Sequence, residues 1–258
     1  MLLVVDAGNS NTVVGLYDGD TLAAHWRLTT NHYRTTDELR IQFTTLMHED
    51  GYNPKRVEGC CISSVVPQLN HALLQVSREA FKTEPVMVEP GIRTGIKLHN
   101  ENPKELGADR LVNAVGAVEE YPGDKIIIDF GTATTLDFVT AEAEYKGGII
   151  LPGIQLAANA LFEHCAKLPR VDVTTPERVV GRNTVSAISS GLSYGYADLV
   201  DGLVRRIREE TETEPQVIAT GGLATVIASL ASSIHVVDRF LTLKGLRAIY
   251  QKNLKEVA

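Results

Sequence analysis

Cysteine is scarce in this chain of 258 residues, and none of its three cysteines forms a CxxC pair. Cys60, Cys61 and Cys165 therefore indicate neither a disulfide framework nor a zinc knuckle, and we expect them to be small buried apolar residues. The seven histidines show no HExxH or HxH spacing. The sequence thus predicts no transition-metal site.

Long hydrophobic runs are also missing. The longest candidate, residues 147–162, is interrupted by Pro152, Gln155 and Asn159, so it is not expected to span a bilayer. The apolar residues 1–5 lack a basic start and meet Asp6 at once, which favours a first strand over a signal peptide. We expect a soluble, cytoplasmic protein with no membrane partner.

An excess of basic charge is absent as well, because the net charge is −7 at pH 7. A chain of this charge repels phosphate backbones, so no nucleic-acid partner is expected. Two nucleotide motifs are missing too: no GxxxxGK[ST] occurs, and no GxGxxG follows a strand. Residues 129–131 spell the DFG of protein kinases, but the lysine, catalytic-loop and glycine-rich motifs that accompany it are lacking.

The most informative feature that is present is an internal repeat. Residues 4–13 read VVDAGNSNTV and residues 127–136 read IIDFGTATTL, at a constant offset of 123 residues. Each copy has a β-branched run, then Asp-x-Gly-x-x-x-Thr, then a second apolar stretch, which is the pattern of a hairpin with a glycine-containing turn. Two similar halves are predicted.

The boundary between the halves is predicted near Tyr121-Pro122, where a helical pattern stops and a new apolar strand begins. Residues 1–121 would form the N-terminal half and residues 122–258 the C-terminal half. Helical periodicity covers residues 36–47, 70–81, 111–120, 155–167, 184–210 and 243–254, and strands are predicted at 59–65 and 216–220. This mixture is typical of an α/β architecture.

Both hairpin turns carry groups that can bind a phosphate chain. Glycines let backbone amides approach phosphates, and hydroxyl and amide side chains can donate hydrogen bonds. These side chains are Asn9, Ser10, Thr12, Thr132, Thr134 and Thr135. Asp6 and Asp129 would repel phosphates unless a cation lies between, so the arrangement predicts Mg²⁺ or another hard cation.

A carboxylate that accepts the hydroxyl proton helps phosphoryl transfer to an alcohol, and Asp109 is our candidate. Its neighbour Arg110 could hold an anionic substrate carboxylate or form a structural ion pair with Asp109.

Two glycine patterns leave alternatives open. Gly221 and Gly222, after the strand at 216–220, suit close approach to a flat ligand such as adenine or a plain turn. Gly191 and Gly195 would leave a flat strip on a helix, for close helix packing or for a dimer interface.

Together, these residues resemble the type III pantothenate kinases, and the resemblance covers nearly the whole chain. The matching motifs are DAGNSNT at 6–12, TDE at 36–38, SSVVP at 63–67, GADR at 107–110, DFGTATT at 129–135, Gly148 with Pro152-Gly153, Asn183-Thr184, and TGGLA at 220–224. The resemblance implies two ribonuclease-H-like halves around a central cleft, as in actin-like ATPases, and a homodimer. It implies transfer of the ATP γ-phosphoryl group to the primary alcohol of pantothenate, the first step of coenzyme A biosynthesis.

The resemblance also implies roles for single residues. The ATP phosphates would be held by Thr132 and by the first hairpin, namely Asp6, Ala7, Gly8, Asn9, Ser10, Asn11, Thr12 and Val13. Asp129 would bind a monovalent cation, K⁺ or NH₄⁺, and Asp109 would be the general base. Pantothenate would be bound by Gly107, Ala108, Asp109, Arg110 and Thr184.

One position departs from the family pattern. Such sequences usually read Tyr-Asp-Asn-Pro ahead of GADR, whereas this chain has Asn100-Glu101-Asn102-Pro103, so a tyrosine contact to pantothenate is missing. Two alternatives stay open: another small-molecule kinase or phosphatase of the superfold, and a regulatory or accessory relative that binds ligands without turnover. The Asp109-Arg110 element argues against the first, and the presence of both Asp109 and Asp129 favours catalysis over the second.

Overall fold

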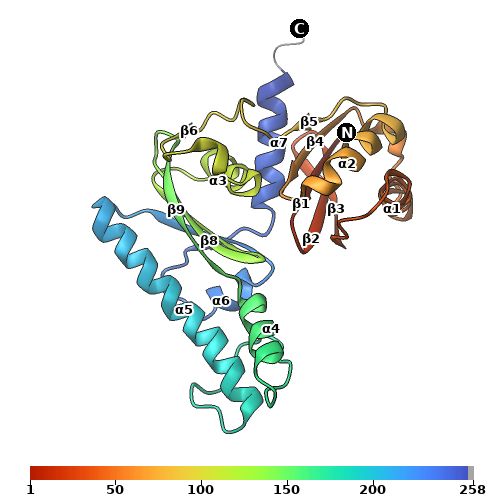
Figure 1. Ribbon diagram of the computed structural model, residues 1–258. Helices are drawn as coiled ribbons and strands as arrows, with labels where there is room; N and C mark the ends of the chain where they lie inside the picture. Colours follow the sequence, from red (N-terminus) through yellow and green to blue (C-terminus); the bar gives the residue numbers. More distant parts are fainter. Residues whose placement is uncertain (255–258) are drawn as a thin grey trace. The chain divides into compact units, whose positions relative to one another are not determined.

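The computed structural model describes residues 1–254 and shows an α/β protein with two mixed sheets (Figure 1). It divides into two compact units. The first comprises residues 1–96, residues 101–119 and the segment from Leu241, and the second comprises residues 97–100 and 120–240. The division into halves at residues 121 and 122 stays a prediction, and residues 255–258 of the predicted second half lie outside the described residues.

The first unit contains a five-stranded sheet with the strand order β3-β2-β1-β4-β5. The strands are β1 (Leu2–Ala7), β2 (Asn11–Asp18), β3 (Thr21–Thr29), β4 (Gly59–Ser64) and β5 (Val86–Met87). β1 runs antiparallel to β2 and parallel to β4, which confirms the first predicted hairpin.

Three helices pack on the sheet of the first unit, and a fourth packs against one of them. α1 (Thr36–Glu49), α2 (Pro67–Ala80) and α7 (Leu241–Leu254) lie on the sheet, and α3 (Ala108–Glu120) packs on α7. The short turns η1 (Pro54–Arg56) and η2 (Pro103–Glu105) precede β4 and α3. Leu3 and Val5 of β1 join the apolar side chains of α1 and α2 in one core. α7 lies close to the strands at Gly59, where a Cβ atom would overlap the ring of Tyr250.

The second unit repeats this plan in a six-stranded sheet with the order β11-β10-β7-β8-β9-β6. The strands are β6 (Lys97–Leu98), β7 (Lys125–Phe130), β8 (Ala133–Val139), β9 (Glu144–Pro152), β10 (Gln216–Gly221) and β11 (Val236–Val237). β7 is antiparallel to β8 and parallel to β10, as β1 is to β2 and β4. The repeat read from the hairpins therefore extends through five strands of each sheet.

The core of the second unit lies between its sheet and three helices, α4 (Ile154–His164), α5 (Thr184–Thr211) and α6 (Ala224–Ala228). α5 begins where the sequence predicts because Asn183 caps it: the Asn183 side chain accepts from the Ser186 amide at 2.8 Å. α1 begins in the same way, since Thr35 and Glu38 form a capping box.

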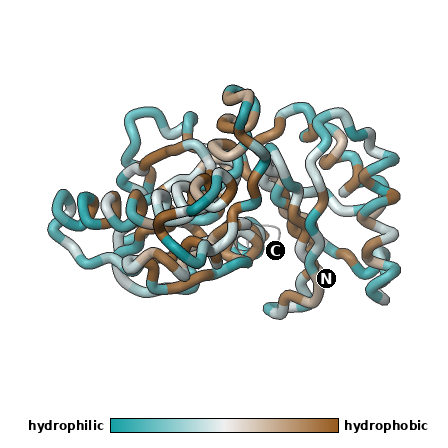
Figure 2. The backbone as a smooth tube through the Cα atoms, turned by 90° about the horizontal axis from the view of Figure 1, so that it is seen from below, coloured by the Kyte–Doolittle hydropathy of each residue, from teal (hydrophilic) through white to brown (hydrophobic). Residues whose placement is uncertain are grey.

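Most predicted helices are confirmed, with shifted ends. α2 begins at Pro67, three residues earlier than predicted. Proline is favoured in the first turn of a helix, and no side chain caps this end. The prediction that all three cysteines are buried is wrong for Cys165, which is exposed after the end of α4. Hydrophobic and hydrophilic segments alternate along the chain (Figure 2), and no helix within residues 1–254 has the length and apolar character needed to cross a membrane.

Candidate active site

The turn of the first hairpin is tight and partly exposed. Asp6 pairs with Val13 and Ala7 with Thr12 across β1 and β2, and the Gly8 amide donates to the Asn11 carbonyl at 3.0 Å. Asn9 and Ser10 are exposed at the tip, whereas Thr12 is only 4% exposed. The turn therefore presents backbone and short polar side chains while its base is fixed in the sheet.

The SSVVP motif lies beside this hairpin. In the parallel pairing of β1 with β4, Asp6 is opposite Ser63 and Ala7 is opposite Ser64, and the Val65 amide donates to the Ala7 carbonyl at 3.0 Å. α2 begins two residues later, so this unit brings a helix N-terminus next to the strand that carries Asp6.

Thr30 also contacts the hairpin, and the sequence analysis did not identify it. It follows directly after β3, and its hydroxyl donates to the Gly8 carbonyl at 2.7 Å and lies 2.9 Å from the Thr12 hydroxyl. The internal repeat could have pointed to Thr30. Thr30 and Gly153 are 123 residues apart, the same offset as between the two hairpin motifs.

The GADR motif forms the start of α3. The Arg110 amide donates to Asp109 Oδ1 at 2.8 Å, so the carboxylate folds back over its own helix terminus. Gly107 makes room for it, since a Cβ atom there would lie 2.5 Å from Asp109 Oδ1. Asp109 is half-buried and thus partly accessible.

α3 is held against α7 by two glycines. A Cβ atom on Gly116 would lie 2.5 Å from the Leu241 carbonyl, and one on Gly245 would overlap the Val112 carbonyl. The Thr242 hydroxyl donates to the buried Asn113 side chain at 2.7 Å. The helix that begins with Asp109 is therefore anchored by contacts too close for any residue larger than glycine at these two points.

The second hairpin is held by glycine contacts as well. Asp129 pairs with Thr135 across β7 and β8, and Thr132 is exposed at the turn. The Gly153 amide donates to the Thr132 carbonyl at 3.1 Å, and a Cβ atom on Gly153 would overlap the same carbonyl. Because Gly153 is the N-cap of α4, the helix begins directly at the turn.

Gly221 lies next to the Asp129 carboxylate in the same unit. A Cβ atom on Gly221 would lie 2.5 Å from Asp129 Oδ1, and its φ of +93° favours glycine. Gly131 is also near, since its Cβ atom would lie 3.4 Å from the same oxygen. The TGGLA motif therefore lies against the DFG turn, and Gly221 is in close contact with Asp129.

Thr184 is the first residue of α5 and is exposed. Its neighbours Asn183 and Val185 line a pocket of about 910 Å³ formed by residues between 170 and 189. Three arginines contribute to this pocket, Arg170, Arg178 and Arg182, together with Asp172 and Glu177. Thr184 thus borders a cavity that is lined by both basic and acidic side chains.

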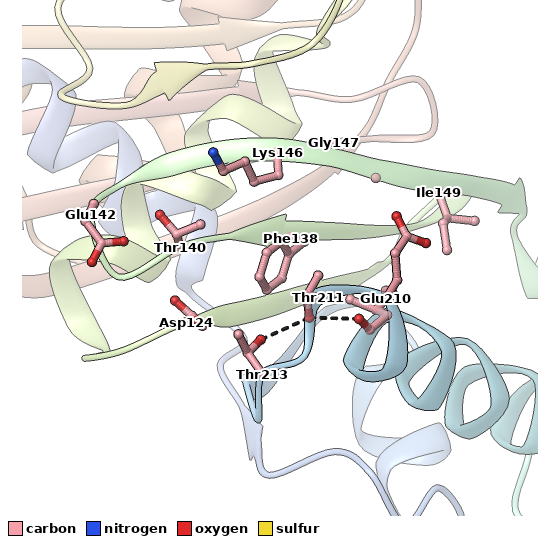
Figure 3. A pocket seen from close by; sticks show the side chains of 12 residues that line it. Asp124, Phe138, Thr140, Glu142, Lys146, Gly147, Ile149, Glu210, Thr211 and Thr213 are labelled. Carbon is pink, nitrogen blue, oxygen red and sulfur yellow. Dashed lines mark hydrogen bonds between the residues drawn. The ribbon is translucent and has the colours of Figure 1, made fainter.

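A second pocket, of about 730 Å³, lies in the same unit between β8, β9 and the end of α5 (Figure 3). Its lining includes Asp124, just before β7, and Thr140, just after β8. These strand ends are the ones far from the Asp129–Thr132 turn. None of the predicted site residues lines it. The predicted site residues therefore lie apart from this pocket.

The predicted site residues thus fall into two sets. The first unit holds Asp6–Val13 and the GADR residues, and the second unit holds Asp129, Thr132 and Thr184. Within residues 1–254, no group of three or more His, Cys, Asp or Glu side chains is arranged to hold a metal ion by itself.

The chain is similar to known proteins over nearly its whole length. The model of the type III pantothenate kinase family matches residues 2–206. The chain belongs to this family. A type III pantothenate kinase of Syntrophotalea carbinolica is 50% identical over 98% of this chain and 99% of its own length. Another, from Exiguobacterium sp., is 48% identical over 99% of this chain and all of its own length.

Solved structures agree on the fold. The activator of the 2-hydroxyisocaproyl-CoA dehydratase from Clostridium difficile superimposes with a TM-score of 0.59 at 14% identity, over 100% of this chain and 98% of that one. The ethanolamine utilization protein EutJ from Carboxydothermus hydrogenoformans gives 0.58 at 13% identity, over 96% and 89%. The fold is that of actin-like ATPases and sugar kinases, with two ribonuclease-H-like halves.

Proposed function

We propose that this chain transfers the γ-phosphoryl group of ATP to the primary alcohol of pantothenate and forms 4′-phosphopantothenate, the first step of coenzyme A biosynthesis. The observation that carries the proposal is the identity of 48% to 50% with type III pantothenate kinases over essentially the full length of both chains. The GADR motif at the start of α3 and the two Asp-x-Gly hairpins supply the groups that such a reaction needs.

Asp109 is the general base in this proposal. The alcohol oxygen of pantothenate attacks the γ-phosphorus, its proton passes to the Asp109 carboxylate, and the bond from phosphorus to the ADP oxygen breaks. Gly107, Ala108, Arg110 and Thr184 bind pantothenate together with Asp109. Support comes from the anchored position of α3, because a base must be held within hydrogen-bond reach of the proton that it accepts.

The phosphates of ATP are bound by Thr132 and by the first hairpin, Asp6 to Val13. Each turn contains one glycine, Gly8 or Gly131, and both turns lie close to a helix N-terminus, that of α2 for the first and that of α4 for the second. Helix N-termini and oriented backbone amides favour anions. This supports phosphate binding at each turn.

Cations are part of the proposal because carboxylates precede both turns. Gly131 and Gly221 lie close to Asp129 Oδ1. Carboxylate oxygens are ligands that hard cations prefer, so Asp129 would hold K⁺ or NH₄⁺, and Asp6 would face Mg²⁺ bound to ATP. Such cations neutralise phosphate charge. Equal activity in sodium and potassium buffers would contradict the assignment to Asp129.

We also propose a homodimer that forms through the second unit. Six large hydrophobic side chains are exposed on α4, on the loop after it and at the start of α5: Leu156, Leu161, Phe162, Val179, Val180 and Val185. A Cβ atom on Gly191 or Gly195 would meet no atom within 4 Å, so these glycines are not needed for packing inside the chain. Val180, 79% exposed, offers the test: we expect Val180→Glu to sediment as a monomer and the wild type as a dimer.

The enzyme would work in the cytoplasm, where ATP is available. The activity is tested by an ADP-release assay with ATP, Mg²⁺ and K⁺ that compares pantothenate with glycerol, common sugars, acetate and polyphosphate. Turnover with pantothenate alone is expected. Turnover with another acceptor would contradict the substrate, and a pantothenate-dependent rise of the melting temperature without turnover would instead support an accessory protein.

The role of Asp109 is tested by Asp109→Asn, with Asp18→Asn at an exposed position of β2 as the matched control. We expect the first variant to lose about 10²- to 10⁴-fold in kcat while ATP binding is kept. The control should match the wild type. If Asp109→Asn keeps turnover within a few-fold of the wild type, Asp109 is not the base.

A further inference from the structure

Thr30 makes three hydrogen bonds to the first hairpin turn. Its amide donates to the Ser10 carbonyl at 3.0 Å. Its hydroxyl donates to the Gly8 carbonyl at 2.7 Å and is 2.9 Å from the hydroxyl of Thr12. One residue outside the hairpin therefore bonds to three of its positions.

The direction of the hydroxyl bonds can be deduced from the number of protons. A carbonyl oxygen only accepts, so the single proton of the Thr30 hydroxyl is used on Gly8. The proton between the two hydroxyls must then come from Thr12. The chain of donation runs from Thr12 to Thr30 to the Gly8 carbonyl, and the Thr12 proton is not available to a phosphate.

These bonds fix the peptide groups of the exposed tip. In a trans peptide the carbonyl and the following amide N–H point in opposite directions. Holding the Gly8 carbonyl therefore sets the direction of the Asn9 amide, and holding the Ser10 carbonyl sets that of the Asn11 amide. Oriented backbone amides are the donors that a phosphate-binding turn uses.

The second hairpin has a similar backbone bond without the side chain. Gly153, 123 residues after Thr30, also follows the third strand of its sheet, and its amide donates to the Thr132 carbonyl at 3.1 Å. At the 123-residue offset Thr132 is equivalent to Asn9, so this acceptor lies one residue before the equivalent of Ser10. Both units thus have a backbone bond from this position to the turn, but of these two residues Thr30 alone has a hydroxyl that adds further bonds.

We propose that Thr30 is a positioning residue for ATP: it holds the backbone amides of the first hairpin in the orientation that binds the phosphates. Thr12 acts through Thr30 and not by donating its hydroxyl proton to ATP. The inference rests on the proposed function in one respect only, namely that the first hairpin binds the phosphates of ATP.

The test compares Thr30→Val, which removes the hydroxyl at nearly constant shape, with Thr30→Ser, which keeps it. Thr29→Val is the matched control, since Thr29 is exposed on the neighbouring position of β3. We expect Thr30→Val to raise the KM for ATP about tenfold, as for one lost hydrogen bond, with the KM for pantothenate unchanged within about twofold. Thr30→Ser should stay within about threefold of the wild type, and the control should equal it.

Thr12→Val examines the other end of the chain of donation. Because Thr12 acts through Thr30, the double variant Thr12→Val/Thr30→Val should raise the KM for ATP no more than Thr30→Val alone. A further increase in the double variant, of the size of the Thr12→Val effect, would mean that Thr12 contacts ATP independently and would overturn this part of the proposal.

Two outcomes would overturn the role of Thr30. They are an unchanged KM for ATP in Thr30→Val, whether or not the melting temperature falls, and an equal rise in both KM values. Calorimetric titration of ATP and Mg²⁺ without pantothenate gives the same comparison without turnover. It therefore decides on Thr30 even if the wild type does not phosphorylate pantothenate, which would be a failure of the proposed function instead. If Thr30→Val does not fold, Thr12→Val and Thr30→Ser still give the comparison.

Discussion

The two hairpins share one motif and one sheet topology, yet their turns are held by different means. In the first unit a side chain, Thr30, bonds to the Gly8 carbonyl and to Thr12. In the second unit the residue at the same place is Gly153, which brings the start of α4 into direct contact with the Thr132 carbonyl. The shared motif determines that a turn forms, and the residue after the third strand determines how it is held.

The difference has a practical consequence for substitution. A turn held by a hydroxyl can lose one bond and keep its packing, so its variants should affect ligand binding more than folding. A turn held by a close glycine contact has no room to adjust, so its variants should affect folding first.

The largest effect is expected for Gly153→Ala. Its Cβ atom would overlap the Thr132 carbonyl, which is backbone and cannot move aside like a side chain. We expect a loss of about 3 kcal/mol in the free energy of unfolding, measured by urea titration.

Gly8→Ala is the counterpart in the first hairpin, where the Cβ atom would lie 3.1 Å from the Asn11 carbonyl. Its change should stay within about 1 kcal/mol, and equal losses in both variants would contradict the distinction.

The next effect concerns the anchoring of α3 in the first unit. We expect Gly245→Ala to lower the free energy of unfolding by about 1 to 3 kcal/mol, because its Cβ atom would overlap the Val112 carbonyl. It should also lower kcat, since α3 carries Asp109. Gly202→Ala in α5 is the control, because a Cβ atom there meets nothing within 4 Å. The control should gain about 0.5 to 1 kcal/mol; a gain in both would show that the two helices can separate at no cost.

A smaller, qualitative difference between the units is expected for thiol reactivity. Cys60 and Cys61 are buried in β4 of the first unit, and burial raises the pKa of Cys60 to about 12 and that of Cys61 well above its usual value. The exposed Cys165 lies in the second unit. We expect a thiol reagent at pH 8 to modify one cysteine per native chain and three in denaturant. Rapid reaction of a second thiol in the native protein would show that the strands beside the first hairpin open.

The smallest effect is a pH dependence in the second unit. The Asp201 carboxylate accepts hydrogen bonds from the amides and hydroxyls of Ser232 and Ser233 at 2.6 to 2.9 Å. Burial raises the pKa of Asp201, but these four bonds outweigh it and hold the pKa below its usual value of 3.8. The stabilisation is therefore fully present above pH 3.8 and is lost as the pH falls through the folded-state pKa.

Comparison with Asp201→Asn isolates this contribution. The difference in the free energy of unfolding between wild type and variant should be constant near neutral pH and should shrink below about pH 4. A difference that does not change with pH in acid would show that the charge of Asp201 does not contribute.

The sequence alone predicted the elements that have a local signal. Both hairpins follow from their Asp-x-Gly turns, and α1 and α5 begin where Thr35 and Asn183 supply caps. The third strands were not predicted. β3 is polar on its exposed face, and β9 contains Gly147 and Gly148, so neither has a clear strand pattern.

The candidate site shows a similar limit. Its motifs were recognised because they are short and contiguous, as in GADR at the start of α3. Thr30 was missed because its proposed role depends on hydrogen bonds to residues 18 and 22 positions away, which no local pattern reveals. Extending the 123-residue repeat from the hairpins to the residue after each third strand would have pointed to Thr30 and Gly153.

The most direct measurement is the identification of both products from a reaction of the purified protein with ATP, Mg²⁺, K⁺ and pantothenate. Phosphorus NMR and mass spectrometry would quantify ADP and the phosphate ester together. The account predicts one 4′-phosphopantothenate for each ADP in the wild type, and both products formed at least about 10²-fold more slowly in Asp109→Asn. ADP accompanied by free phosphate, or no product at all from a folded wild-type protein, would contradict it.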